Sequence, residues 1–175
     1  IMPSLVGSEM CIRDRLEGLQ VIINNGDISI VSSDDGINST ATSGQGIVID
    51  GGNLYILAGG DGLDSNSRTA YSGIVFKGGK TVVISTSGGN SAIDTEAGYT
   101  YTSGSVLAIM PNGGMTSEAT HCSNFSSVAK KISMSLSSGK TLTVSVSNSA
   151  ILSVKIPCNL SAIVIYLGST SANIS

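Results

Sequence analysis

The sequence predicts an all-β protein in which a parallel β-solenoid is followed by an antiparallel C-terminal cap. The first observation is a short alternating apolar run behind a Gly or Asn turn, which recurs at residues 25–30, 51–56 and 78–84. The second is an Asp- and Asn-rich motif after each run, whose apolar centres Ile37, Leu63 and Ile93 are 26 and 30 residues apart. One such repeat cannot bury its apolar face until the next coil stacks on it, so the repetition favours a solenoid.

Helical repeats fit the sequence poorly. They need apolar residues at three and four spacing over about ten residues per helix. Here Gly and Asn interrupt each apolar run after about five residues. A content of 22 Gly with only 12% charged residues also points to β structure rather than to disorder or a coiled coil. The 175 residues are enough for one domain with a substantial core.

The chain divides into three segments. We expect residues 1–15 to be a non-native or disordered leader, because they carry no repeat feature, lack the apolar region of a signal peptide and resemble a translated artefact that recurs at the ends of environmental sequence assemblies. We expect the solenoid repeats over residues 16–115 and a C-terminal β meander over residues 116–175. The meander is predicted from alternating runs at residues 132–136, 142–146, 151–156 and 163–167. It would cover the open end of the solenoid.

Repeated polar side chains are expected to form vertical columns, because equivalent positions in a parallel solenoid lie about 4.8 Å apart. One predicted column holds Asp35, Asp61 and Asn90, and its neighbour holds Asn38, Asp64 and Asp94. Stacked carboxylates repel one another unless a cation sits among them. Calcium is the natural candidate, since it accepts six to eight oxygens in loose geometry, whereas magnesium demands a tighter octahedron.

The predicted calcium ligands are Asp34, Asp35, Asn38, Asp61, Asp64, Asn66, Asn90 and Asp94. The alternative is that these residues only form turns, because Asp-Gly and Asn-Gly pairs are common turn formers. Repetition at matched positions favours the metal.

Charge is distributed unevenly along the chain. Residues 16–100 carry nine acidic and three basic side chains, whereas residues 101–175 carry four lysines and one Glu. An acidic repeat region argues against nucleic acid as a partner, because binding phosphates needs clustered Lys and Arg. No run of eighteen apolar residues is present, so no membrane insertion is expected.

The cysteines of the repeat and cap segments are Cys122 and Cys158. A composition that reads as extracellular favours a disulfide between them, which would contribute about 3 to 4 kcal/mol in the chain-entropy model. The alternative is two free thiols.

No catalytic residue is assigned. With one His, no G-x-S-x-G motif and no paired Cys/His ligands, nucleophilic and zinc mechanisms lack their parts. One enzymatic alternative remains: calcium-assisted β-elimination on a uronic acid polymer, with Arg68, Lys77 or Lys80 as the base. Solvated surface charge is the commoner role for such side chains.

The repeats resemble a known family. The similarity is carried by residues 17–19, 25–30, 33–38, 51–56, 60–66 and 87–94, and by 113–115 and 154–157 in the tail. These segments resemble the bacterial carbohydrate-binding domain-containing β-helix family, found on the surfaces of polysaccharide-degrading clostridia. The resemblance implies a right-handed parallel β-helix similar to calcium-dependent pectate lyases, with calcium at Asp-rich turns and affinity for plant cell-wall polysaccharide. The sequence departs from the family where Asn38 replaces an Asp and where residues 90–92 replace a second Asp-Gly.

We therefore expect a secreted or surface-attached, non-catalytic binder of plant cell-wall polysaccharide, such as pectin or cellulose. An acidic glycan such as polygalacturonate, held partly through calcium, is favoured, and the domain is expected to be a monomer within a larger surface protein. The candidate sugar contacts are Tyr55, Arg68, Tyr71, Tyr99 and Tyr101. Tyrosines that only fill the faces of the solenoid are the alternative. A pectate lyase and a structural adhesin without a glycan ligand are the alternative functions.

Overall fold

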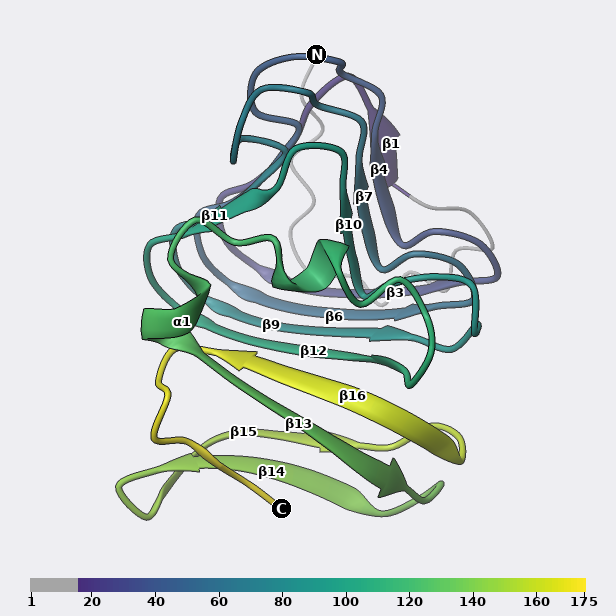
Figure 1. Ribbon diagram of the computed structural model, residues 1–175, viewed down its shortest axis with the longest axis vertical. Helices are drawn as coiled ribbons and strands as arrows, with labels where there is room; N and C mark the ends of the chain where they lie inside the picture. Colours follow the sequence, from purple (N-terminus) through teal and green to yellow (C-terminus); the bar gives the residue numbers. More distant parts are fainter. Residues whose placement is uncertain (1–15) are drawn as a thin grey trace.

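A computed structural model describes residues 16–175, so the predicted leader at residues 1–15 lies outside the described part of the chain. The chain winds through four coils, and each coil contributes one strand to each of three parallel sheets (Figure 1). The predicted parallel β-solenoid is confirmed.

The strands of the solenoid are short and lie in register from coil to coil. The first sheet contains β1 (Leu16–Gly18), β4 (Ile37–Ser39), β7 (Leu63–Ser65) and β10 (Ile93–Thr95). The second contains β2 (Val21–Ile23), β5 (Ile47–Ile49), β8 (Ile74–Phe76) and β11 (Tyr99–Tyr101). The third contains β3 (Asp27–Ser32), β6 (Asn53–Ala58), β9 (Lys80–Ser85) and β12 (Ser105–Pro111).

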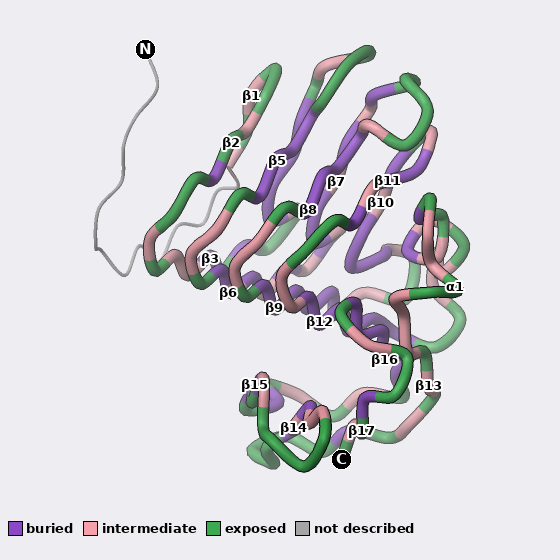
Figure 2. The backbone as a smooth tube through the Cα atoms, turned by 90° about the vertical axis from the view of Figure 1, so that its left-hand side faces the viewer, coloured by how far each residue is buried: buried purple, intermediate pink, exposed green. Residues whose placement is uncertain are grey.

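The core of the solenoid is a stack of inward apolar side chains. Ile37, Leu63 and Ile93 are register partners and are fully buried, as the spacing of the repeats predicts. Phe76 and Tyr99 meet edge to face in the same core, with their ring centroids 5.9 Å apart. Burial of each such side chain stabilises the fold by about 1.5–3 kcal/mol. Figure 2 shows the buried segments running along the inside of successive coils.

The C-terminal strands do more than cap the solenoid. They are β13 (Ala129–Leu136), β14 (Thr141–Val146), β15 (Ser149–Lys155), β16 (Leu160–Leu167) and β17 (Asn173–Ile174). Strand β16 pairs antiparallel with β12 on one side and with β13 on the other, which extends the third sheet to six strands. The remaining strands form a separate sheet in the order β15-β14-β17. The antiparallel cap is confirmed, but a simple meander is wrong, because the exposed edge of β12 is closed by a strand distant in sequence.

A second apolar core lies between the outer face of the third sheet and the sheet β15-β14-β17. Val82 and Ile84 of β9 pack there with Leu152 and Val154 of β15. These side chains alternate with the inward-facing residues of their strands, so one strand feeds both cores.

The helical segments are a 3₁₀ turn, η1 (Glu118–Thr120), and one helical turn, α1 (Phe125–Val128). They link the solenoid to the C-terminal strands (Figure 1). Within residues 16–175, no helix is both long and apolar enough to cross a membrane.

The expected disulfide is not formed. Cys122 and Cys158 are both free. The main chain of Cys122 forms an isolated parallel β-bridge with Tyr99 of the second sheet. Its thiol lies 3.2 Å from Asn124 Oδ1. Cys158 instead follows β15 and interacts electrostatically with Tyr55 on the third sheet. The two thiols therefore belong to different faces of the solenoid.

Close stacking of the coils makes particular glycines necessary. A Cβ added at Gly62 would meet Val83 Cγ1 and would lie 2.5 Å from the Ala92 carbonyl oxygen. A Cβ at Gly88 would meet nothing within 4 Å. We expect Gly62→Ala to lower the free energy of unfolding by about 1–3 kcal/mol, because the backbone must shift to accommodate the methyl group. The control Gly88→Ala should leave it unchanged or slightly raised. Equal effects in urea denaturation would contradict this account of the packing.

Candidate functional site

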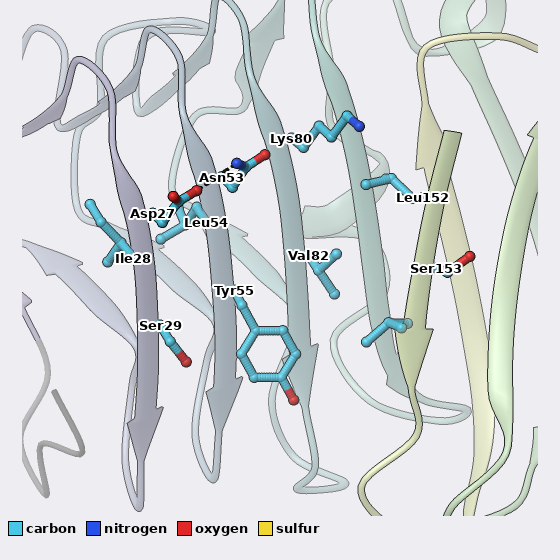
Figure 3. Close-up of a pocket in the computed structure, with 11 residues that line it drawn as sticks. Asp27, Ile28, Ser29, Asn53, Leu54, Tyr55, Lys80, Val82, Leu152 and Ser153 are labelled. Atoms are coloured by element: carbon cyan, nitrogen blue, oxygen red, sulfur yellow. Dashed lines mark hydrogen bonds between the residues drawn. The ribbon is translucent and has the colours of Figure 1, made fainter. Parts of the chain in front are cut away.

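A groove of about 540 Å³ lies between the outer face of the third sheet and strand β15 (Figure 3). Its floor comes from three successive coils, and its wall comes from β15. The lining residues are Asp27, Ile28, Ser29, Asn53, Leu54, Tyr55, Lys80, Val82, Leu152, Ser153 and Val154. The groove has the size typical of small-ligand sites.

Strand register arranges the floor in rows that run across the strands. Asp27, Asn53 and Lys80 are register partners and form one polar row. Asn53 Nδ2 donates a hydrogen bond of 2.6 Å to Asp27 Oδ1. Lys80 is exposed and forms no ion pair within residues 16–175. The row therefore presents a carboxylate, an amide and an ammonium group side by side.

The next row combines a hydroxyl, an aromatic ring and an aliphatic side chain. It consists of Ser29, Tyr55 and Val82. Tyr55 is partly buried, and burial raises the pKa of its phenol, an effect to which the nearby Cys158 adds. Figure 3 shows its ring on the floor of the groove, between β6 and β9. An apolar ring beside hydrogen-bonding groups suits a ligand that has both apolar faces and hydroxyl groups.

The acidic column lies on another face, along the first sheet. Glu17, Asn38, Asp64 and Asp94 are successive register partners on β1, β4, β7 and β10. The predicted stacking of the last three residues is therefore confirmed. Asn38 Nδ2 donates to Asp64 Oδ2 at 2.8 Å and lies 3.4 Å from Asp35 Oδ2. Asn38 Oδ1 is buried and has no hydrogen-bond partner among residues 16–175.

The second predicted column has a structural role in the turns. The Asp61 N–H donates to Asp35 Oδ1 at 3.0 Å, and the Ser91 N–H donates to Asp61 Oδ1 at 2.6 Å. Ser91, rather than the predicted Asn90, is therefore the residue that meets Asp61. The longer repeat before Ile93 places three of its four additional residues in the loop that precedes Ser91 and one in the loop between β7 and β8. Each carboxylate thus joins one coil to the next.

A second pocket, of about 340 Å³, opens beside the acidic column. Its lining includes the four acids Asp64, Asp94, Glu96 and Glu118. Burial raises the pKa of Asp94 to about 6, and the charges of Asp61 and Glu118 add to the rise. Burial also raises the pKa of Asp61. Half-buried carboxylates close to one another thus hold protons more tightly than they do in water.

The other predicted metal ligands are more dispersed. Asn66 lines the acidic pocket, but its Nδ2 donates to the Ser39 carbonyl at 3.3 Å. Asn90 lies in the loop before β10, and Asp34 lies in the turn after β3. Within residues 16–175, no three His, Cys, Asp or Glu side chains converge in an arrangement that could hold a metal ion. Any cation held there needs amide or main-chain oxygens as well, and Asn38 Oδ1 is the buried oxygen available.

The five predicted sugar contacts lie in different parts of the structure. Tyr99 and Tyr101 are buried, and their hydroxyls donate to the carbonyls of Ala119 and Gly104, each at 2.7 Å. They are core residues, so the prediction that they contact sugar is wrong. Tyr71 is 41% exposed and packs edge to face against His121, and Arg68 is exposed in the same loop. Of the five predicted contacts, Tyr55 alone lines the groove.

The sequence did not predict three residues of the groove, because their shared position holds a different residue type in each repeat. Asp27, Asn53 and Lys80 each follow the turn that opens a repeat, so their shared position is the signal that could have found them.

The candidate bases of the lyase alternative do not lie beside the acidic column. Lys77 Nζ lies 3.7 Å from Asp50 Oδ1, and Lys80 lies in the groove.

The solenoid, the lateral groove and the polar rows define a binding module of the β-solenoid class. Comparison with protein-family models gives its family: the chain belongs to the carbohydrate-binding domain-containing proteins, whose model matches residues 17–171. The match spans the solenoid and most of the C-terminal strands. Comparisons with curated proteins and with solved structures gave no match.

The raised pKa of Asp94 makes stability depend on pH. Because the folded state binds this proton more tightly than the unfolded state, ionisation of Asp94 costs stability as pH rises through about 6. In chelator, Asp94→Asn should be more stable than the parent at pH 7.5, and the difference should shrink toward pH 4.5. The measurement is urea denaturation across this range. Asp50→Asn, outside the acidic pocket, is the control and should show no such trend. A pH-independent difference for Asp94→Asn would contradict the prediction.

Proposed function

We propose that this chain is a non-catalytic module that binds polysaccharide in the groove between the third sheet and β15. The observation that carries the proposal is the juxtaposition of Tyr55 with the row Asp27, Asn53 and Lys80. The aromatic ring offers an apolar face for the C–H side of a sugar ring. The polar row offers donors and acceptors for its hydroxyls. Membership of a carbohydrate-binding family supports this reading.

The favoured ligand is an acidic glycan such as polygalacturonate. Lys80 is the cation among the residues that line the groove, and it has no ion pair of its own within residues 16–175. It is therefore available to a uronate carboxylate. Asp27 lies two coils away from Lys80, and its carboxylate already accepts a hydrogen bond from Asn53.

Removing the ring of Tyr55 tests the proposed site. We expect Tyr55→Ala to weaken retention on polygalacturonate or on insoluble cellulose by roughly tenfold, which corresponds to about 1.4 kcal/mol of binding free energy. Tyr71→Asn is the matched control, because it removes an exposed tyrosine far from the groove with a residue that tolerates the positive φ of 53°. Affinity electrophoresis in glycan-containing gels gives the measurement.

Equal retention of the two variants would show that the binding site lies outside the groove. Absence of retention of the parent on both glycans would leave the adhesin alternative. The appearance of unsaturated uronate, followed by absorbance, would instead establish the lyase.

We further propose that calcium binds at the acidic column. Asn38 Oδ1 and main-chain oxygens would supply neutral ligands, and Asp64 together with Asp35 or Asp94 would supply carboxylates; calcium would compensate their charge. The support is a buried oxygen that has no partner in the described part of the chain, together with carboxylates whose stacking is unfavourable without a cation. This site would tie three coils together and hold the groove floor in register from the side.

Calcium should therefore stabilise the fold. At about a hundred times its dissociation constant, a ligand that binds only the folded state contributes roughly 2.7 kcal/mol. We expect the melting temperature to rise with millimolar calcium, and Asp64→Asn to abolish most of this rise while keeping the turn shape. Asp50→Asn should respond like the parent. A parent protein with the same melting temperature in calcium and in chelator would end the calcium proposal without affecting the groove.

A further inference from the structure

We infer that the groove receives the end of a linear glycan, with the chain running across the strands and its terminal sugar against β15. This inference rests on the proposed polysaccharide-binding function and specifies how the ligand lies. It follows from three features of the groove: the spacing of its rows, the difference between its two ends and the hydrogen-bonding groups of its wall.

The rows repeat at the spacing of the coils. Asp27, Asn53 and Lys80 stand one per coil, and so do Ser29, Tyr55 and Val82 in the parallel row. Neighbouring strands lie about 4.8 Å apart. A glycan chain advances by a similar distance with each pyranose residue, so a chain that runs across the strands meets one polar side chain per sugar. A chain along a strand would meet side chains of one coil only.

The two ends of the groove differ. At one end lies β3, the edge strand of the third sheet as described, where Asp27 is exposed and Ser29 is half-buried. At the other end the floor reaches Val82, which is 8% exposed because Leu152 and Val154 of β15 pack in the same core. Figure 3 shows Leu152 and Ser153 of β15 on the side of Val82 that faces away from Ile28 and Ser29 of β3. Among residues 16–175, the path across the strands is thus open toward β3 and blocked at β9.

The wall carries groups suited to a chain terminus. Strand β15 is an edge strand, because it pairs only with β14 in its sheet. The Ile156 N–H donates to the Lys140 carbonyl, so alternation along the strand turns the Ser153 main-chain groups away from β14. Together with Lys80, these main-chain groups provide donors and acceptors for the free hydroxyl or carboxylate groups of a terminal sugar. The Ser153 hydroxyl itself lies on the other face of β15, 3.3 Å from Thr143 Oγ1.

The first experiment separates recognition of chain ends from recognition of chain interiors. The parent protein is titrated with intact polygalacturonate and with the same mass of polymer after partial acid hydrolysis, and a cellulose preparation treated in the same way is the second probe. We expect the number of binding sites per gram, from isothermal titration calorimetry or depletion, to rise in proportion to the number of chain ends.

Each outcome bears on a different statement. Capacity that follows mass rather than ends would overturn end recognition and leave polysaccharide binding intact. Failure to bind either probe, intact or hydrolysed, would overturn the proposed function and this inference with it.

The second experiment tests the direction of the chain through pairs of variants. With galacturonate oligomers of two to six residues, Lys80→Met at the closed end should weaken binding of every length by about tenfold. Asp27→Asn at the open end should change the affinity for dimers less than twofold and change that for tetramers or longer by severalfold. Lys77→Met, which removes a neighbouring lysine outside the groove, is the control. The same length dependence for Lys80→Met and Asp27→Asn would overturn the proposed direction.

Discussion

Parallel register between successive coils is the constraint on which the structure depends. It stacks Ile37, Leu63 and Ile93 into one buried column, and it stacks whatever polar residues lie beside them. A carboxylate in one coil therefore meets the equivalent position of the next at the strand spacing of about 4.8 Å, whether or not the contact is favourable. The floor of the groove is ordered by the same rule, because side chains from three coils line up across its sheet.

The same register places the stacked carboxylates in different surroundings. Asp35 and Asp61 accept hydrogen bonds from main-chain N–H groups of the following coil, and the bond from Ser91 opposes the rise that burial causes in the pKa of Asp61. Asp94 is instead partly buried among other acids, and its proton affinity rises. Asn38 relieves this repulsion one coil earlier by donating to Asp64. The replacement of an acid by an amide at this point therefore has a structural reason as well as any role toward a cation.

Much of the solenoid could be predicted because its signal is local and repeated. Gly turns, alternating runs and the inward positions of Ile37 and Leu63 are visible in the sequence itself. The pairing of β16 with β12 was not visible, because several strands of similar pattern could close that edge. The sequence also did not show whether Tyr99 and Tyr101 face the core or the solvent, because a tyrosine can be buried when its hydroxyl donates to a carbonyl. The groove depends on β15 meeting β9, a contact between segments distant along the chain.

The second core fastens the C-terminal sheet to the later coils and does not extend to the first coil. Its buried members on the solenoid come from β9 and β12, with partly buried Tyr55 and Leu57 from β6 and no contribution from β3. In a solenoid the free energy of local opening depends on the interfaces that each coil shares, so the second core should raise it at β9 and β12 and not at β3. The groove consequently lies between β9 and β15, which this core stabilises, and β3, which it does not. A ligand that spans the groove would therefore link β3 to the strands that the second core holds in place.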